Sequence, residues 1–259
     1  MPTPFYHLSL AEQVLNHQSL GPEIGYLIHS NRGAFYLGST APDVQVISGQ
    51  KRSGTHFFKV PIPKMARVPW EVLIIKNPQL GAGKSLDLVK AVFVAGYLCH
   101  LQADWFWIKE IFEPIFGPHQ KWGIFSKRLY WHNILRAYLD VQVIADLPVE
   151  QILNNAVVRP QNWLPFIQDL DLLNWWAYLC EQLQPGNNIK TVKVFAAREG
   201  IEVDEFQSML ESEQGMRENI FVHISPGQLA DYRAKIVAHN VALVKNYLGP
   251  RIAPEQISL

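Results

Sequence analysis

The sequence predicts an all-α protein, a compact multi-helix domain, and three observations support this prediction. Helical periodicity dominates the 259 residues, strand-like alternation is scarce, and 48% of the residues are apolar. The alternating runs are short and isolated, at residues 44–47 and 72–75. A chain of this length and apolar content can bury a substantial core, so it is globular rather than disordered.

Apolar residues that recur with a helical period define the expected elements. Ser85 and Ser126 are suited to cap two long helices. Residues 21–84 are interrupted by prolines and glycines, so we expect a long, loop-rich region, and such regions are often functional. The expected helices cover residues 9–16, 85–111, 126–145, 163–183, 189–198, 204–213 and 226–248.

The prediction divides this fold into two halves. Residues 1–145 carry the candidate site, and residues 146–259 form a helical half that we expect to pack in the same domain. Lys and Arg total 23, as do Asp and Glu, so the formal net charge is zero. This balance argues against a broad electrostatic grip on duplex nucleic acid, but not against an enzyme that holds one phosphate through metal ions.

The first residues lack a charged segment followed by an apolar one, so no signal peptide is expected. The most apolar run, residues 91–99, is too short to span a bilayer, which needs about 20 residues. We therefore expect a soluble, cytoplasmic protein without a transmembrane segment. The sequence is compatible with peripheral contact to a membrane. The oligomeric state is not defined by the sequence.

The strongest local signal is the segment GYLCHLQADWFW at residues 96–107. His100 and Asp104 are four residues apart on an expected helix, so both project from one face and can approach one cation. Imidazole nitrogens and carboxylate oxygens are standard zinc ligands. The alternative interpretation is a hydrogen-bonded His–Asp pair that stabilises a core helix.

Three upstream residues strengthen the metal interpretation. Asp43 follows Pro42 in the segment FYLGSTAPDVQ, where a turn can hold a carboxylate rigidly. His56 lies beside two aromatic residues in THFF, and His7 lies at the start of a helix in FYHLSLAEQ. Taken singly, each could be a turn residue or a core imidazole.

In this order, the N-terminal His, the G-S-x-x-P-D turn, the T-H-F and the G-Y-x-x-H-x-x-x-D resemble the zinc-dependent phospholipase C family. That family is similar in fold to the fungal single-strand nucleases, and the resemblance covers about residues 1–145. It implies a first zinc site formed by Asp43, His56, His100 and Asp104. It also implies a second zinc that shares Asp104 and takes His7 together with the N-terminal residue.

The resemblance is incomplete at the family's third zinc, which uses two further His residues and a carboxylate four residues after the second. His132 matches the second His, but Arg136 stands four residues later. Asp140 is eight residues after His132, which is about 12 Å along a helix. Glu110 stands where the first His is expected, and His119 follows in a Gly-Pro turn. The third site is therefore incomplete, or rebuilt from Glu110, His119 and His132, or replaced electrostatically by Arg136.

The resemblance implies a metal-dependent hydrolase that uses one to three zinc ions to activate water against a phosphoester. Asp43 is the expected ligand and candidate general base, and a lipid or other small-molecule phosphoester is the expected substrate. The family's N-terminal residue is a tryptophan, whereas this chain begins Met1-Pro2. Two alternatives stay open: a non-catalytic family member that acts as a binding or structural protein, and a single-strand nuclease-like enzyme.

Overall fold

The computed structural model describes residues 1–81 and 83–251, and it confirms the all-α prediction. Within these residues the only extended pairing is a single bridge between Leu164 and Ile167. The α-helices are α1 (Pro4–Leu15), α2 (Pro22–His29), α3 (Arg32–Thr40), α4 (Gln45–Ser48), α5 (Arg52–His56), α6 (Pro69–Lys76), α7 (Pro78–Gly81), α8 (Leu88–Trp107), α9 (Phe125–Ile144), α10 (Val149–Asn154), α11 (Asp169–Gln182), α12 (Thr191–Glu199), α13 (Val203–Glu211), α14 (Glu213–Met216) and α15 (Pro226–Leu248). Short 3₁₀ or π segments are η1 (Gln18–Leu20), η2 (Ala41–Val44), η3 (Gly83–Ser85), η4 (Ile108–Phe116), η5 (Arg217–Phe221) and η6 (Gly249–Arg251).

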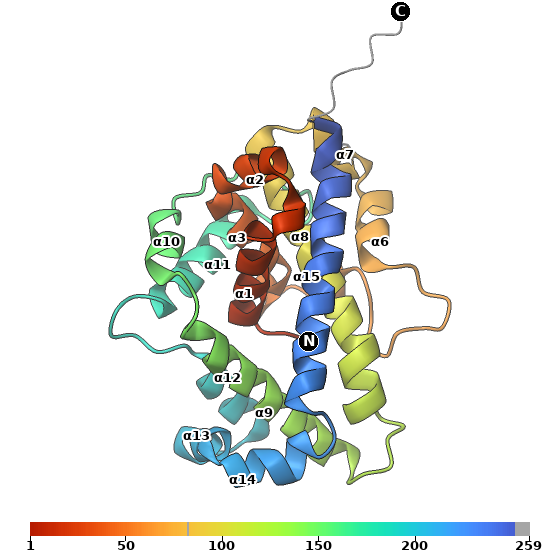
Figure 1. Cartoon of the computed structure of the whole chain (residues 1–259), viewed down its shortest axis with the longest axis vertical. Coiled ribbons are helices and arrows are strands. Elements are labelled where there is room, and N and C mark those ends of the chain that lie inside the picture. The colour runs from red at the N-terminus through yellow and green to blue at the C-terminus, as the bar shows by residue number, and fades with distance from the viewer. Residues whose placement is uncertain (82, 252–259) are drawn as a thin grey trace, which may run out of the picture.

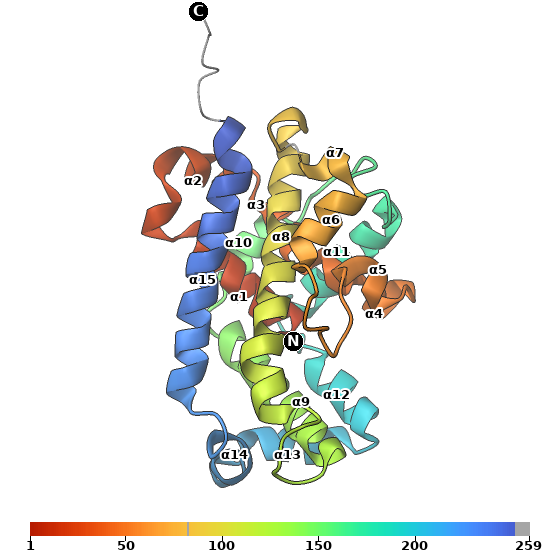
Figure 2. The same cartoon turned by 90° about the vertical axis from the view of Figure 1, so that its right-hand side faces the viewer.

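Helix α8 runs through the centre of the molecule, beside α15 and against α3 (Figures 1 and 2). Its residues are buried on all sides from Ala91 to Trp105, which is the pattern of a helix enclosed by other helices. The side chain of Asp87 accepts hydrogen bonds from the backbone N–H groups of Val89 and Lys90, so Asp87 is the cap and the prediction of Ser85 was wrong.

Two glycines let α3 and α8 approach closely. A Cβ atom added to Gly38 would lie 2.0 Å from the carbonyl oxygen of Phe93, and one added to Gly96 would lie 2.4 Å from that of Phe35. Backbone atoms cannot move aside as a flexible side chain can, so a larger residue at either position would push the helices apart. Both glycines belong to the motifs recognised in the sequence, and their role is helix packing.

In the described part of residues 21–84, six short α-helices replace the expected long loop. Pro22, Pro69 and Pro78 are each the first residue of a helix, where proline has the required φ and needs no N–H partner. Residues 44–47 and 72–75, which alternate like strands, lie in helical segments. Proline marks helix starts here, and tertiary packing determines the conformation of the short apolar runs.

Buried apolar side chains from Phe5 to Leu248 form one contiguous core cluster. Helices α9, α12, α13 and α14 gather at one end of the molecule (Figure 2). The division of the domain near residue 145 stays a prediction. Among the described helices, none combines the length and the apolar character needed to cross a membrane.

Candidate metal centre

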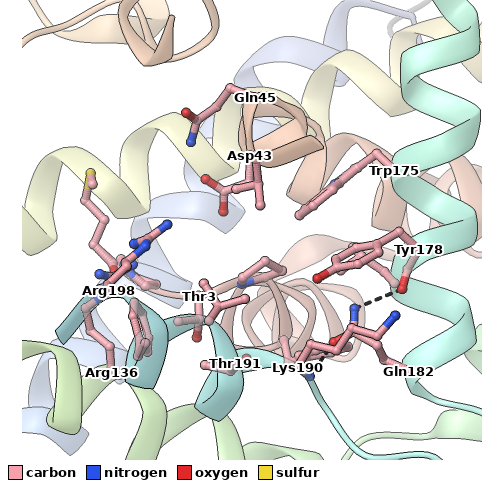
Figure 3. Close-up of a pocket in the computed structure, with 18 of the residues that line it drawn as sticks. Thr3, Asp43, Gln45, Arg136, Trp175, Tyr178, Gln182, Lys190, Thr191 and Arg198 are labelled. Atoms are coloured by element: carbon pink, nitrogen blue, oxygen red, sulfur yellow. Dashed lines mark hydrogen bonds between the residues drawn. The ribbon is translucent and has the colours of Figure 1, made fainter. Parts of the chain in front are cut away.

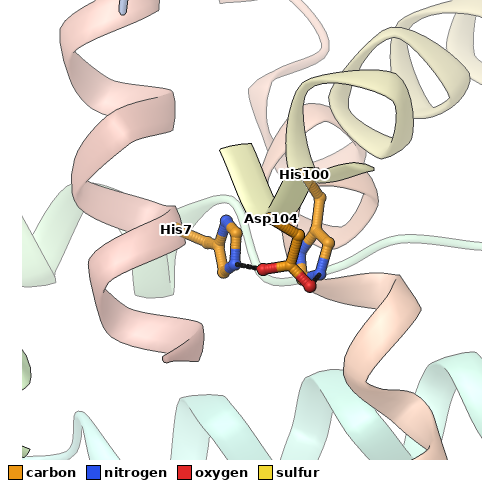
Figure 4. A group of neighbouring side chains, drawn as sticks. All are labelled: His7, His100 and Asp104. Carbon is orange, nitrogen blue, oxygen red and sulfur yellow. Dashed lines mark ion pairs between the residues drawn. The ribbon is translucent and has the colours of Figure 1, made fainter. Parts of the chain in front are cut away.

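His100 and Asp104 lie one turn apart on the same face of α8, and each is only 1% exposed. His100 Nε2 is 3.8 Å from Asp104 Oδ2. Figure 4 shows both side chains directed toward His7 of α1. A carboxylate this deeply buried must be compensated by a partner, because an isolated buried charge is strongly unfavourable.

Asp140 of α9 fixes the position of α1. One of its carboxylate oxygens accepts hydrogen bonds from the Tyr6 backbone N–H, at 2.9 Å, and from the Thr3 hydroxyl. The other oxygen accepts a hydrogen bond from the hydroxyl of Thr191, the first residue of α12. A carboxylate at a helix N-terminus accepts hydrogen bonds from free N–H groups and interacts favourably with the helix dipole. Asp140 therefore orients the turn that carries His7.

His7 completes the first side of the cluster. Its ring stacks on that of His100 with centroids 3.7 Å apart, and its Nε2 lies 3.4 Å from Asp104 Oδ1. His7 is 2% exposed. The three residues form a group whose ligand atoms all lie within 4.8 Å of one another.

Asp43 and His56 form the second side of the cluster. Asp43 follows Pro42 in η2, directly after α3, and His56 is the last residue of α5. Phe57 then adopts a left-handed conformation with φ of 61°, an uncommon and strained conformation for an aromatic residue, and this ends the helix. His56 Nε2 lies 3.4 Å from Asp43 Oδ1 and 3.3 Å from Asp104 Oδ2.

Hydrogen bonds on the outer side of two imidazoles determine their tautomers. His100 Nδ1 lies 2.9 Å from the Ser39 carbonyl oxygen, which can only accept, so this nitrogen carries the proton. The Thr55 hydroxyl donates to the Arg52 carbonyl at 3.2 Å and therefore accepts from His56 Nδ1 at 2.9 Å. In the tautomers with the proton on Nδ1, both Nε2 lone pairs point inward, and the two atoms are 3.3 Å apart.

The cluster thus directs lone pairs and carboxylate oxygens toward a common space. His7 Nε2 and Asp104 Oδ1 are buried without a hydrogen-bond partner. Among the described residues, Arg52 supplies the one cationic side chain in contact with the cluster, 2.8 Å from Asp104 Oδ2. Facing acceptors repel unless a cation lies between them, and nitrogen and carboxylate ligands of this kind suit zinc. Two ligand groups are present in the described part of the chain: His7, His100 and Asp104, and Asp43, His56 and His100.

The protein holds both carboxylates of the cluster ionised. Burial by itself raises the pKa of Asp43, but the adjacent imidazoles of His56 and His100 lower it to about 2. The pKa of Asp104 also lies well below its usual value, since the adjacent imidazoles of His56 and His7 outweigh the effect of burial. Burial, together with the neighbouring His7, lowers the pKa of His100 to about 3, so His100 is neutral and available as a ligand at neutral pH.

The residues predicted for a third zinc are not brought together. Glu110 forms an ion pair with Lys235, and His119 is exposed. His132 is buried, and its Nε2 accepts a hydrogen bond from the Trp107 indole at 2.9 Å. None of the three belongs to a potential ligand group within the residues that the structure describes.

The fold and the cluster define the chain as a helical metalloprotein with a His/Asp centre. It belongs to the zinc dependent phospholipase C family, since the sequence model of that family matches residues 6–170. Zinc is therefore its cofactor, and metal-dependent phosphodiester hydrolysis is the activity of the family. Comparison with curated proteins and with solved structures finds no significant match.

Several residues that shape the centre were missed in the sequence. Arg52 precedes His56 by four residues on α5, a spacing that could have identified it as a neighbour of the site. Thr55 and the Ser39 carbonyl fix imidazole tautomers, but such roles depend on the packed structure. Asp140 was recognised only as too distant to share an ion with His132, and its role is to anchor α1.

Proposed function

We propose that this protein is a zinc-dependent phosphoester hydrolase that acts on a lipid or other small-molecule phosphoester. The observation that carries the proposal is the set of inward-facing lone pairs and ionised carboxylates described above, which opens toward a cavity through Asp43. Asp43 pairs with His56 in the cluster and also lines this cavity of about 280 Å³. It is therefore placed to contact both a metal ion and a bound substrate.

His7, Asp43, His56, His100 and Asp104 would hold zinc. When bound, zinc lowers the pKa of a coordinated water and neutralises charge on a phosphoryl group. The buried imidazoles exclude bulk water from one side of the site. His100 is held by Ser39, and His56 by Thr55, in the tautomers that leave Nε2 free.

We propose that Asp43 orients the attacking water as well as binding the metal. Its pKa of about 2 keeps it ionised at neutral pH, which suits a ligand and makes it a weak base in water. In the cavity, Asp43 would orient the attacking water by accepting a hydrogen bond from it. Its contribution therefore combines metal binding with orientation of the nucleophile.

The test is hydrolysis of bis(p-nitrophenyl) phosphate by zinc-loaded protein and by the Asp43→Asn variant. We expect hydrolysis by the parent protein and a loss of about 10²- to 10⁴-fold in the variant. Asp146→Asn changes an exposed carboxylate outside the cavity and serves as the matched control, with unchanged rate. Hydrolysis that is equally fast in Asp43→Asn would contradict the assignment of Asp43.

One observation favours a second candidate, a zinc-binding protein without hydrolytic activity. Arg136 stands where the resemblance implies a metal-binding carboxylate, and its Nε donates to the Met1 carbonyl. Zinc binding without hydrolysis of phosphate diesters or monoesters would support this candidate over the enzyme.

A further inference from the structure

The cavity beside the metal centre has a cationic wall on the side opposite Asp43. Figure 3 shows Asp43 on one side of the cavity and Arg136, Thr191 and Lys190 on the other. Arg198 also lines it. Lys190, Thr191 and Arg198 lie beyond residue 170, where the match to the family ends, whereas Arg136 lies within it, so the C-terminal part of the chain supplies most of this wall.

Arg136 and Arg198 are neighbouring cations that lack acidic partners. In the described part of the chain, neither has a carboxylate within ion-pair distance, whereas Arg52 and Lys190 are paired with Asp104 and Glu181. Burial and the proximity of Arg198 together lower the pKa of Arg136 to about 10, so it remains charged at neutral pH.

The aromatic faces of this wall are already covered by the protein's own cations. Arg136 and Arg198 lie over the ring of Phe195, with guanidinium carbons 4.6 and 5.4 Å from its centroid. Lys190 Nζ lies 4.8 Å from the centroid of Tyr178. A quaternary ammonium group binds on free aromatic faces, so it would meet positive charge here instead.

The geometry points to a substrate that carries a second anionic group besides the reacting phosphate. We propose that Arg136 and Arg198 bind this second group, a phosphate or a carboxylate, while the reacting phosphate lies against the metal centre. Guanidinium groups form strong, directional hydrogen bonds with both kinds of anion. The cavity thus selects anionic phosphoesters over those with cationic head groups, and this inference rests on the proposed function for the placement of the reacting phosphate.

Binding of three soluble diesters to zinc-loaded protein tests the inference. Glycerophosphoinositol 4-phosphate carries the second anion, glycerophosphoinositol lacks it, and glycerophosphocholine carries a cation instead. We expect calorimetry to show the 4-phosphate bound about tenfold more tightly than glycerophosphoinositol, and glycerophosphocholine bound most weakly. Added salt should reduce the preference.

The variant Arg198→Gln should remove most of this preference, and Arg198→Lys should retain part of it. Arg198 is exposed at the rim of the wall, so its replacement is compatible with folding. Arg159→Gln, an exposed arginine outside the cavity, is the matched control and should keep the full preference. Equal binding of the inositol diesters, tighter binding of the choline diester, or an unchanged preference in Arg198→Gln would overturn the inference.

Hydrolysis measured on the same three diesters separates this inference from the proposed function. Selective binding without turnover would refute the hydrolase and leave the anion site standing. Turnover without selectivity would support the hydrolase and refute the anion site.

Discussion

The two sides of the cavity differ in charge and in what they lack. On one side, imidazole lone pairs and carboxylates from α1, η2, α5 and α8 point inward and outnumber the hydrogen-bond donors. Two of these atoms, His7 Nε2 and Asp104 Oδ1, are buried without a hydrogen-bond partner. On the other side, α9 and α12 present Arg136 and Arg198 without carboxylate partners among the described residues. The first side requires a cation, and the second side requires an anion.

This difference explains how the chain departs from the pattern of its family. The side chains predicted for the first two zinc ions converge around Asp104, and the third set is dispersed. Arg136 stands at the position where a metal-binding carboxylate is implied. Its positive charge belongs to a side chain and does not depend on a bound ion. We therefore interpret the α9 side as a protein-supplied replacement for a metal ion's charge.

The largest effect is expected from Asp104→Asn. Asp104 contacts His7, His56 and Arg52, and the amide would remove the central negative charge of the cluster. Zinc affinity should fall by more than about 100-fold, because loss of a ligand exceeds the effect of losing an outer partner. Competition with a chromogenic chelator measures this affinity, with Asp146→Asn as the control. Unchanged affinity in Asp104→Asn would show that zinc binds elsewhere.

The next largest effect is expected on the unfolding free energy, from Asp140 on α9, the helix that also carries Arg136. Burial raises the pKa of Asp140 to about 6, although its hydrogen bonds from Thr191, Thr3 and Tyr6 act in the opposite direction. The folded state therefore binds this proton more tightly than the unfolded state, so the stabilisation is complete below about pH 4 and is lost as the pH rises through 6.

Urea unfolding of metal-free protein and Asp140→Asn from pH 4 to pH 7 tests this linkage. The difference in unfolding free energy between the two proteins should fall by about 2 kcal/mol over this range, because the variant lacks the titrating group. Other groups titrate in both proteins and cancel in the difference. A difference that stays constant, or grows with pH, would contradict the raised pKa.

Gly96→Ala should disrupt the metal side through its packing. The added methyl group would meet the Phe35 carbonyl oxygen at 2.4 Å and the Ser39 N atom at 2.9 Å. We expect a loss of about 1–3 kcal/mol in unfolding free energy, together with weaker zinc binding, because His100 is held by the Ser39 carbonyl.

Gly25→Ala is the matched control, since Gly25 lies in α2 with no atom within 4 Å of the added methyl group. Alanine there should be neutral or stabilise by up to about 1 kcal/mol, because it reduces the entropy of the unfolded chain. If both variants behaved alike, the close approach of α3 and α8 would not be the cause.

The smallest effect is expected from Glu110→Gln and His119→Ala. Glu110 pairs with Lys235, and His119 is exposed, so neither should change the number of zinc ions bound. Metal analysis by mass spectrometry measures this number. Loss of one ion in either variant would show that Glu110 or His119 binds zinc. A third zinc site would then exist, and the difference in charge between the two sides of the cavity would not hold.

The all-α fold could be predicted from the sequence, because periodicity is a local property of the chain. The short helices between residues 21 and 84 could not, because they depend on packing against other elements, as α2 packs against α3 and α6 against α8. The convergence of His7, Asp43, His56, His100 and Asp104 was implied by the family resemblance rather than by spacing. Spacing alone relates only His100 and Asp104, since the other three residues approach through tertiary structure.

The cationic wall could not be predicted from the sequence either, because it too depends on tertiary structure. Arg136 and Arg198 are 62 positions apart and meet only because both pack over Phe195. Asp140 had a clear position in the sequence, but its hydrogen bonds to Thr3 and Thr191 join three helical regions. Isolated charges in a sequence do not show whether they will be paired, buried or left facing a cavity.

The most direct test of the account is the number of zinc ions that native mass spectrometry counts on the saturated protein. Asp104 faces His7 through Oδ1 and His56 through Oδ2, so its carboxylate can bridge two ions. The account therefore predicts two ions per chain, with no further ion taken up when zinc is raised. A third ion would contradict the replacement of a metal charge by Arg136. No bound zinc at saturation would contradict the metal centre itself.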